Sequence, residues 1–130
     1  MNATNIIDLD TMTNSYAECA LWSSMHFESE EDACGTSFDE VDAGISEKCR
    51  ENFRKDCRDF LDVLEREGIE IGDAMTDEQI GHDFWLTRNG HGAGFWDRGL
   101  GTLGDRLTKW AEVPGSCDLY LGGDGLIYCD

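Results

Sequence analysis

The first 47 residues contain neither lysine nor arginine, although they hold eleven acidic residues. Over the whole chain of 130 residues, 28 acids stand against 10 bases, and the formal net charge is −18. Such a surface repels phosphate backbones and anionic lipid headgroups, which excludes a protein that binds nucleic acid or membranes directly. The charge favours basic partners instead.

Long apolar runs are also missing from the sequence. No stretch approaches the ~18 residues of a membrane span. The first ten residues have neither the basic nor the apolar region of a secretory signal. We therefore expect a cytoplasmic protein with reduced thiols. Its length predicts one domain, 1–130, whose N-terminal part, 1–47, is strongly acidic.

Cysteine pairs of the type CxxC or CxxxxC are absent as well. Zinc modules use such pairs to place two metal ligands on one turn of the chain. Cys49 and Cys57 fall on the apolar stripe of a predicted helix, so we expect them in the core as small hydrophobic residues. A metal held by Cys19 with His26, or by Cys117 with Cys129, is the less favoured alternative. We predict no metal and no other cofactor.

Four helices are predicted from apolar spacing and capping residues. The strongest pattern runs from Ser46 to Glu67, where apolar residues recur every three or four positions and Gly68 follows as a stop signal. Capping boxes predict helices over 16–25 and over about 76–81. These boxes pair Ser15 with Glu18 and Thr76 with Gln79. The fourth helix is expected over 103–112.

Two hairpins complete the predicted fold. Asn89–Gly90 separates two aromatic-rich stretches and is a strong short-range hairpin signal, which predicts strands over 83–88 and 92–97. The segment 118–129 predicts a second hairpin through a glycine-rich turn. Two hairpins can form one small antiparallel sheet with helices against one face. The predicted class is therefore α+β, with about four helices and hairpins at about 83–97 and 118–129.

The segment 81–99, GHDFWLTRNGHGAGFWDRG, gathers two histidines, two tryptophans and five glycines. Three interpretations compete for it. The favoured one is structural, with the aromatic residues packing the sheet and Arg88 and Arg98 paired with acids. The others are catalysis by His91 with Asp97 as its orienting carboxylate, and a metal site. The metal would be held by His82, His91, Asp83 or Asp97.

The sequence HDFWLTRNGHGAGFWDRG, residues 82–99, resembles a group of small uncharacterised proteins of bacteriophages and plasmids. The resemblance extends over residues 76–130, through a short helix and the ending GDGLIY. It implies a mobile element acting inside a bacterium, in the host cytoplasm. It carries over no active site, because no function is attached to the group, and it leaves the acidic N-terminal half unaccounted for.

Charge and origin together favour a protein that mimics nucleic acid and inhibits a host DNA- or RNA-binding defence complex of the anti-CRISPR or anti-restriction type. A compact chain of this length is about 35 Å across. Duplex DNA carries about 20 charges over that distance, which is close to the net charge of this chain. The partner is a basic nucleic-acid-binding groove. The predicted contacts are the acids that have no base near them in sequence: Glu28, Glu30, Glu31, Asp32, Asp39, Glu40 and Asp42.

Two alternative roles are left open by the sequence. The chain can be a small enzyme or ligand-binding module centred on His82, His91 and Asp97. Its acidity can also serve solubility alone. The number of copies in the functional protein, one or two, is left open as well.

Overall fold

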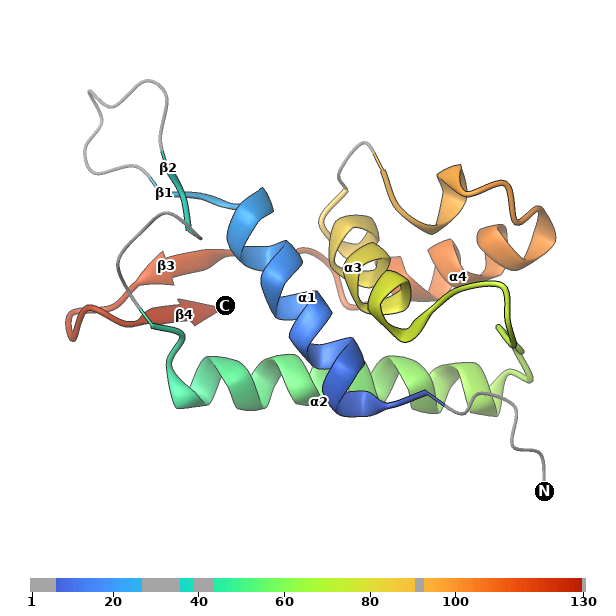
Figure 1. Ribbon diagram of the computed structural model, residues 1–130, viewed down its shortest axis with the longest axis horizontal. Coiled ribbons are helices and arrows are strands. Elements are labelled where there is room, and N and C mark those ends of the chain that lie inside the picture. Colours follow the sequence, from blue (N-terminus) through green and yellow to red (C-terminus); the bar gives the residue numbers. More distant parts are fainter. Residues whose placement is uncertain (1–6, 27–35, 39–43, 91–92, 130) are drawn as a thin grey trace.

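The computed structural model describes residues 7–26, 36–38, 44–90 and 93–129. Within these ranges the chain forms four α-helices, one short 3-10 helix and two pairs of short antiparallel strands. Helix α2 is the longest element, and α1 crosses in front of it (Figure 1). Helix α3 stands beside α1, while the β3–β4 hairpin lies over the N-terminal end of α2. The four helices and the small antiparallel hairpin confirm the α+β class.

Helix α2, Glu47–Arg66, confirms the prediction from apolar spacing. Ser46 is its N-cap, and the Ser46 hydroxyl oxygen accepts a hydrogen bond from the backbone N–H of Cys49 at 3.0 Å. The buried stripe consists of Cys49, Phe53, Cys57, Phe60 and Leu64. The other faces carry charged residues, so the helix is amphipathic along its whole length.

Helix α1, Leu9–Ser23, begins well before the predicted range. Its N-cap is Asp8, whose carboxylate accepts from the Asp10 N–H, and its buried face begins at Met12. The predicted capping box at Ser15 is wrong because Ser15 lies inside the helix. The Ser15 hydroxyl donates instead to the carbonyl of Glu78, 2.6 Å away. This hydrogen bond joins α1 to the first turn of the helix that begins at Asp77.

The predicted hairpin over 83–97 is also wrong. The capping box of Thr76 and Gln79 is present, but the helix that it starts, α3 (Asp77–Arg88), continues through the first predicted strand. Asn89 caps the C-terminus of α3, and Gly90 follows with φ +68°. A positive φ is what an Asn–Gly hairpin turn needs, but it is equally what a glycine just after a helix provides. The segment that follows forms a short 3-10 helix, η1 (Phe95–Asp97), where a second strand was predicted.

Gly81 explains how α3 packs against α1. A Cβ atom at this position would overlap the carbonyl oxygen of Met12, so only glycine allows the two backbones to approach this closely. Ile80 and Phe84, four residues apart, are buried with Trp85 on the helix face that this contact creates. Tertiary packing therefore holds α3 helical despite its aromatic residues, which favour strands.

The predicted C-terminal hairpin is confirmed as β3 (Leu119–Leu121) and β4 (Ile127–Cys129). Leu119 pairs with Cys129, and Leu121 pairs with Ile127. The backbone N–H of Ser46 donates to the carbonyl of Ile127 at 2.8 Å, which anchors the hairpin at the start of α2. The other strand pair, β1 (Met25–His26) with β2 (Thr36–Ser37), forms a separate sheet, so no sheet of four strands is found in the described residues.

The core is an aromatic cluster to which three helices and η1 contribute. The rings of Phe60 and Phe84 stack with centroids 4.3 Å apart, and the Phe95 ring also stacks with Phe60 at 5.7 Å. Tyr16 meets Phe84 and Trp85 at 5.2 and 5.3 Å. Helix α4, Thr102–Glu112, agrees with its predicted range and adds Leu107 and Ala111 to the buried set.

Candidate functional site

Asp83 and Arg98, at opposite ends of the 82–99 motif, form an ion pair. The Asp83 side chain is 3% exposed and the Arg98 side chain 31%. Arg98 donates from Nη2 to Asp83 Oδ1 at 3.0 Å and from Nε to Oδ2. These hydrogen bonds raise the pKa of Arg98. The pair fastens the chain after η1 to the middle of α3.

The loop within the motif folds back onto α3. The backbone N–H of Phe95 donates to the Thr87 hydroxyl at 3.2 Å. A Cβ atom at Gly94 would overlap that same hydroxyl oxygen, so a glycine is required there. The Asp97 carboxylate accepts from the Gly94 N–H at 3.3 Å, which closes the turn of η1. The described part of the motif is therefore a packing unit, as the favoured interpretation predicted, but it packs helices and not a sheet. Phe84, Trp85 and Phe95 are buried, whereas Trp96 is exposed.

Arg88 is the second cation of the motif, and its side chain is buried, with 7% exposed. Its Nη1 donates to the Tyr16 hydroxyl at 2.8 Å and to Asp56 Oδ2 at 2.9 Å, and its Nε donates to the carbonyl of Gly115 at 2.8 Å. One side chain thus joins α1, α2, α3 and the segment after α4. Burial raises the pKa of Tyr16 well above its usual value, so Tyr16 is a neutral member of this network. The predicted pairing of Arg88 and Arg98 with acids is confirmed.

His82 lies at the surface beside this unit. Its side chain is 34% exposed, and Nδ1 is 3.4 Å from Asp83 Oδ1. The ring packs on the indole of Trp22 with centroids 5.6 Å apart. A shallow hollow of about 260 Å³ lies next to it, with Ser15 and Arg98 in its wall. Because the Ser15 hydroxyl already donates to the Glu78 carbonyl, this hollow holds no activated serine.

The proposed centre of His82, His91 and Asp97 is not assembled by the described residues. His82 packs on Trp22, the Asp97 carboxylate closes the turn of η1, and His91 lies outside the described residues. Across the parts of the chain that the structure describes, no three His, Cys, Asp or Glu side chains are arranged to hold a metal ion.

Five of the six cysteines can be placed. Cys49 and Cys57 are buried in the core, which confirms their predicted role. Cys19 and Cys117 are buried as well, Cys129 is half-buried, and these five thiols are free. Cys34 lies outside the described residues.

The seven acids predicted to bind the partner lie outside the described residues, in 27–35 and 39–43. A second group of acids, which we call the acidic edge, lies at the N-terminal ends of α1 and α3 and in the connection that leads into α3: Asp8, Glu70, Asp73, Asp77 and Glu78. The start of α1 lies beside the start of α3, since the Asp8 N–H donates to Asp77 Oδ2 at 3.2 Å. Within the described chain none of these five carboxylates forms an ion pair. The sequence shows the run from 70 to 78 but not that Asp8 joins it.

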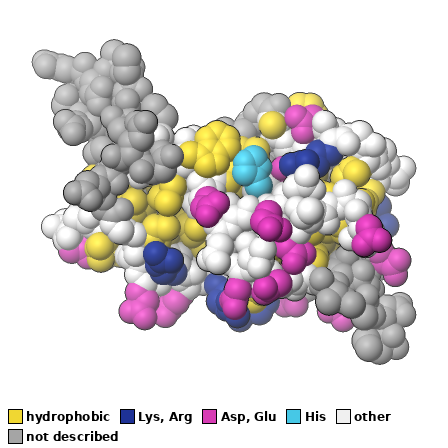
Figure 2. Space-filling view, viewed as in Figure 1, with side chains coloured by type: hydrophobic (Ala, Val, Ile, Leu, Met, Phe, Trp, Pro, Cys, Tyr) yellow, Lys and Arg dark blue, Asp and Glu magenta, His cyan; other side chains and the backbone are white. Residues whose placement is uncertain are grey.

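Basic residues are distributed unevenly over the elements. Helix α2 carries six bases and six acids and is neutral overall. The rest of the described chain holds fourteen acids and four bases. Two of these four, Arg88 and Arg98, are already bound to Asp56 and Asp83. Figure 2 shows acidic side chains over the centre and along the lower side of one face, with basic side chains at a few separate places.

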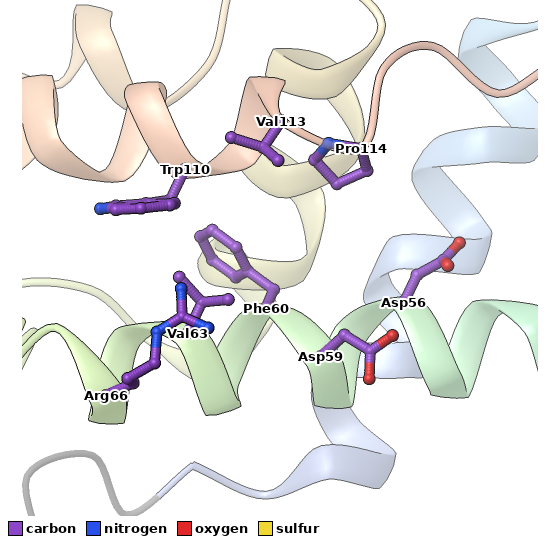
Figure 3. A pocket seen from close by; sticks show the side chains of 8 residues that line it. All are labelled: Asp56, Asp59, Phe60, Val63, Arg66, Trp110, Val113 and Pro114. Atoms are coloured by element: carbon purple, nitrogen blue, oxygen red, sulfur yellow. The ribbon is translucent and has the colours of Figure 1, made fainter.

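An apolar groove of about 310 Å³, which sequence reasoning missed, lies between α2 and α4. Phe60 and Val63 face Trp110, Val113 and Pro114 across it (Figure 3). Asp56 and Asp59 lie at one end. Arg66 lies at the other, with its guanidinium carbon 5.7 Å from the centroid of the Trp110 ring. The groove depends on how two helices distant in sequence pack, so no local pattern could have indicated it.

Comparison of the chain with protein-family models, with curated proteins and with solved structures finds no match. In the described part of the chain, no helix combines the length and the apolar character that crossing a membrane requires.

Proposed function

We propose that this protein is an acidic inhibitor that mimics nucleic acid and occupies the basic groove of a host DNA- or RNA-binding defence complex. The observation that carries the proposal is the excess of acids left without basic partners. Outside α2 the described residues hold fourteen acids against four bases, and two of those bases are taken up by internal ion pairs. The segment 28–42 adds seven more acids and no base.

Part of the acidic edge has a structural role. Asp8, Asp77 and Glu78 stand at helix N-termini, where carboxylates stabilise the helix through its dipole. Glu70 and Asp73 lie in the connection between α2 and α3, where helix stability does not call for them. The seven acids of segment 28–42 likewise precede α2 and have no base beside them in sequence. A row of unpaired carboxylates is what a basic groove would bind in place of phosphates.

The origin implied by the 82–99 motif supports a target in host defence. Proteins of bacteriophages and plasmids meet bacterial nucleases whose grooves are built to hold a polyanion. An inhibitor of the anti-CRISPR or anti-restriction type would act in the host cytoplasm and bind protein, not nucleic acid. The packing role of the motif fits this proposal, because the motif would then serve as the scaffold that presents the acidic surface.

The test compares two charge reversals of equal size in an assay of nuclease inhibition. Purified protein is added to a host lysate that cleaves labelled duplex DNA or RNA, and the inhibiting concentration is measured. The segment variant reverses four predicted contacts to lysine: Glu28, Glu30, Glu31 and Asp32. The control variant reverses four exposed acids that form no ion pair within the described residues: Glu51, Asp62, Glu65 and Glu112.

A charge pair near 4 Å is worth about 1 kcal/mol in water, so loss of four pairs should weaken inhibition by about 100- to 1000-fold. The control variant should change it by less than about threefold, although its net charge is identical. Glu70→Lys with Asp73→Lys should weaken inhibition by roughly tenfold if the acidic edge takes part in binding. His82→Ala and His91→Ala should have no effect. Inhibition that survives in the segment variant, or inhibition lost through His91→Ala, would contradict the proposal.

A further inference from the structure

Three cysteines meet where the C-terminal hairpin joins α2, and the acidic surface plays no part in this cluster. Cys129 comes from β4, Cys117 from the residues before β3, and Cys49 from the first turn of α2. The thiols of Cys117 and Cys49 both lie close enough to the Cys129 sulfur to shift its pKa. Asn52 donates to the same sulfur from Nδ2 at 3.8 Å, and the Cys129 thiol donates to the Cys49 carbonyl oxygen at 3.9 Å.

Strand pairing explains why Cys117 and Cys129 face each other. Leu119 is the direct partner of Cys129, and directly paired residues share one face of a sheet. Cys117 lies two positions before Leu119, so extended chain would put it on that same face, diagonal to Cys129. The backbone N–H of Cys117 donates to Asn89 Oδ1 at 2.7 Å, which holds this cysteine in place from the end of α3.

The three thiols differ in reactivity. The neighbouring thiols of Cys117 and then of Cys49 lower the pKa of Cys129 below its usual value. The same contacts, together with burial, raise the pKa values of Cys49 and Cys117 above their usual range. Cys129 is also the least buried of the three. The thiolate is the reactive form of cysteine, so the accessible sulfur is also the nucleophilic one.

We propose that Cys129 is a redox modification site that reacts with low-molecular-weight disulfides and then forms an intramolecular disulfide with Cys117. In the first step the Cys129 thiolate attacks one sulfur of the reagent, the S–S bond of the reagent breaks, and one half leaves as a thiolate that takes up a proton from water. In the second step the Cys117 sulfur attacks Cys129, its proton passes to the departing sulfur, and the other half leaves. Two protein thiols are oxidised by two electrons, and the disulfide reagent is reduced to two thiols.

Oxidation would couple the hairpin to the rest of the fold. The segment that carries Cys117 is already bound to the end of α3, through Arg88 to the Gly115 carbonyl and through Asn89 to Cys117. A bond from Cys117 to Cys129 would join β4 covalently to that segment. It closes a loop that contains only the hairpin, so the helical core stays as it is.

The test uses the full-length protein under native conditions with oxidised glutathione as the probe. Remaining thiols are blocked at intervals, and the products are identified by peptide mass mapping. The wild type should yield a Cys117–Cys129 disulfide. Cys117→Ser should stop at a mixed disulfide between glutathione and Cys129, while Cys129→Ser should slow the loss of thiols by at least tenfold.

Cys57→Ala is the matched control, because Cys57 is a core thiol outside the cluster and should leave the reaction at Cys129 unchanged. Circular dichroism shows whether each variant is folded. If Cys129→Ser does not fold, the Cys117→Ser variant still tests the proposal, because it should stop at the mixed disulfide between glutathione and Cys129. Oxidation of Cys129→Ser at the wild-type rate, a disulfide between any other pair of cysteines, or reaction only in denaturant would overturn the proposal.

Discussion

Removing the Arg98 guanidinium should destabilise the protein far more than removing the charge of its partner Asp83. In Arg98→Met the carboxylate of Asp83, 3% exposed, loses its counter-charge and has no access to water. In Asp83→Asn the guanidinium, 31% exposed, can turn towards solvent. The two variants break the same ion pair, but only the first leaves a buried charge without a partner.

The size of the loss follows from the cost of leaving one partner of a buried ion pair alone. Breaking such a pair by removing one partner lowers the free energy of unfolding by about 3–5 kcal/mol. Asp83→Asn should lower it by only about 1–2 kcal/mol, because the partly exposed guanidinium can bind water instead.

The assay is urea unfolding followed by tryptophan fluorescence. It is repeated in a His82→Asn background, because His82 Nδ1 lies 3.4 Å from Asp83 Oδ1 and also contacts that carboxylate. Arg98→Met should lower the free energy of unfolding by about 3–5 kcal/mol in both backgrounds. Equal losses for Arg98→Met and Asp83→Asn would refute the reasoning.

Three further predictions concern stability and are checked by the same unfolding assay. Gly81→Ala should lower the free energy of unfolding by about 3 kcal/mol, because the Cβ of alanine would overlap the Met12 carbonyl oxygen. An unchanged midpoint of urea unfolding would show that α1 and α3 can separate freely. Gly90→Val should lower the free energy of unfolding by about 1–3 kcal/mol, because a β-branched residue resists a φ of +68°. An unchanged stability would mean that α3 ends elsewhere. Burial raises the pKa values of Cys19 and Cys57 from 9.0 to about 12. The unfolded chain then loses these protons first, so stability should be fully present below pH 9 and fall towards pH 12 by about 1.4 kcal/mol per pH unit for each thiol. A flat profile between pH 9 and pH 11 would contradict the burial of these thiols.

Local patterns predicted the elements whose signals lie within one segment. Apolar spacing and the glycine stop at Gly68 predicted α2, and the glycine-rich turn predicted the β3–β4 hairpin. The Asn89–Gly90 signal failed because the same positive φ ends a helix or turns a hairpin, and the choice depends on packing against α1. Ser15 misled in the same way, since its hydroxyl contacts a carbonyl 63 residues away in sequence.

The sequence predicted the type of contact in the candidate site but not the residues that make it. The sequence indicated that Arg88 and Arg98 pair with acids, but their partners, Asp56 and Asp83, depend on which helices meet. Cys117 and Cys129 were paired as metal ligands in one alternative, whereas the structure places them with Cys49 in a cluster of thiols. Contacts of this kind arise from tertiary packing, which no local spacing encodes.

The salt dependence of inhibition tests the central claim most directly. A polyanion mimic should bind its target through many charge pairs, each of which is weakened as salt screens it. For about seven such contacts, the inhibiting concentration measured in the host lysate should rise on the order of 1000-fold between 50 and 200 mM salt. The segment variant should show a much flatter dependence, and the control variant should follow the wild type. Inhibition that is equally strong at both salt concentrations would contradict the account.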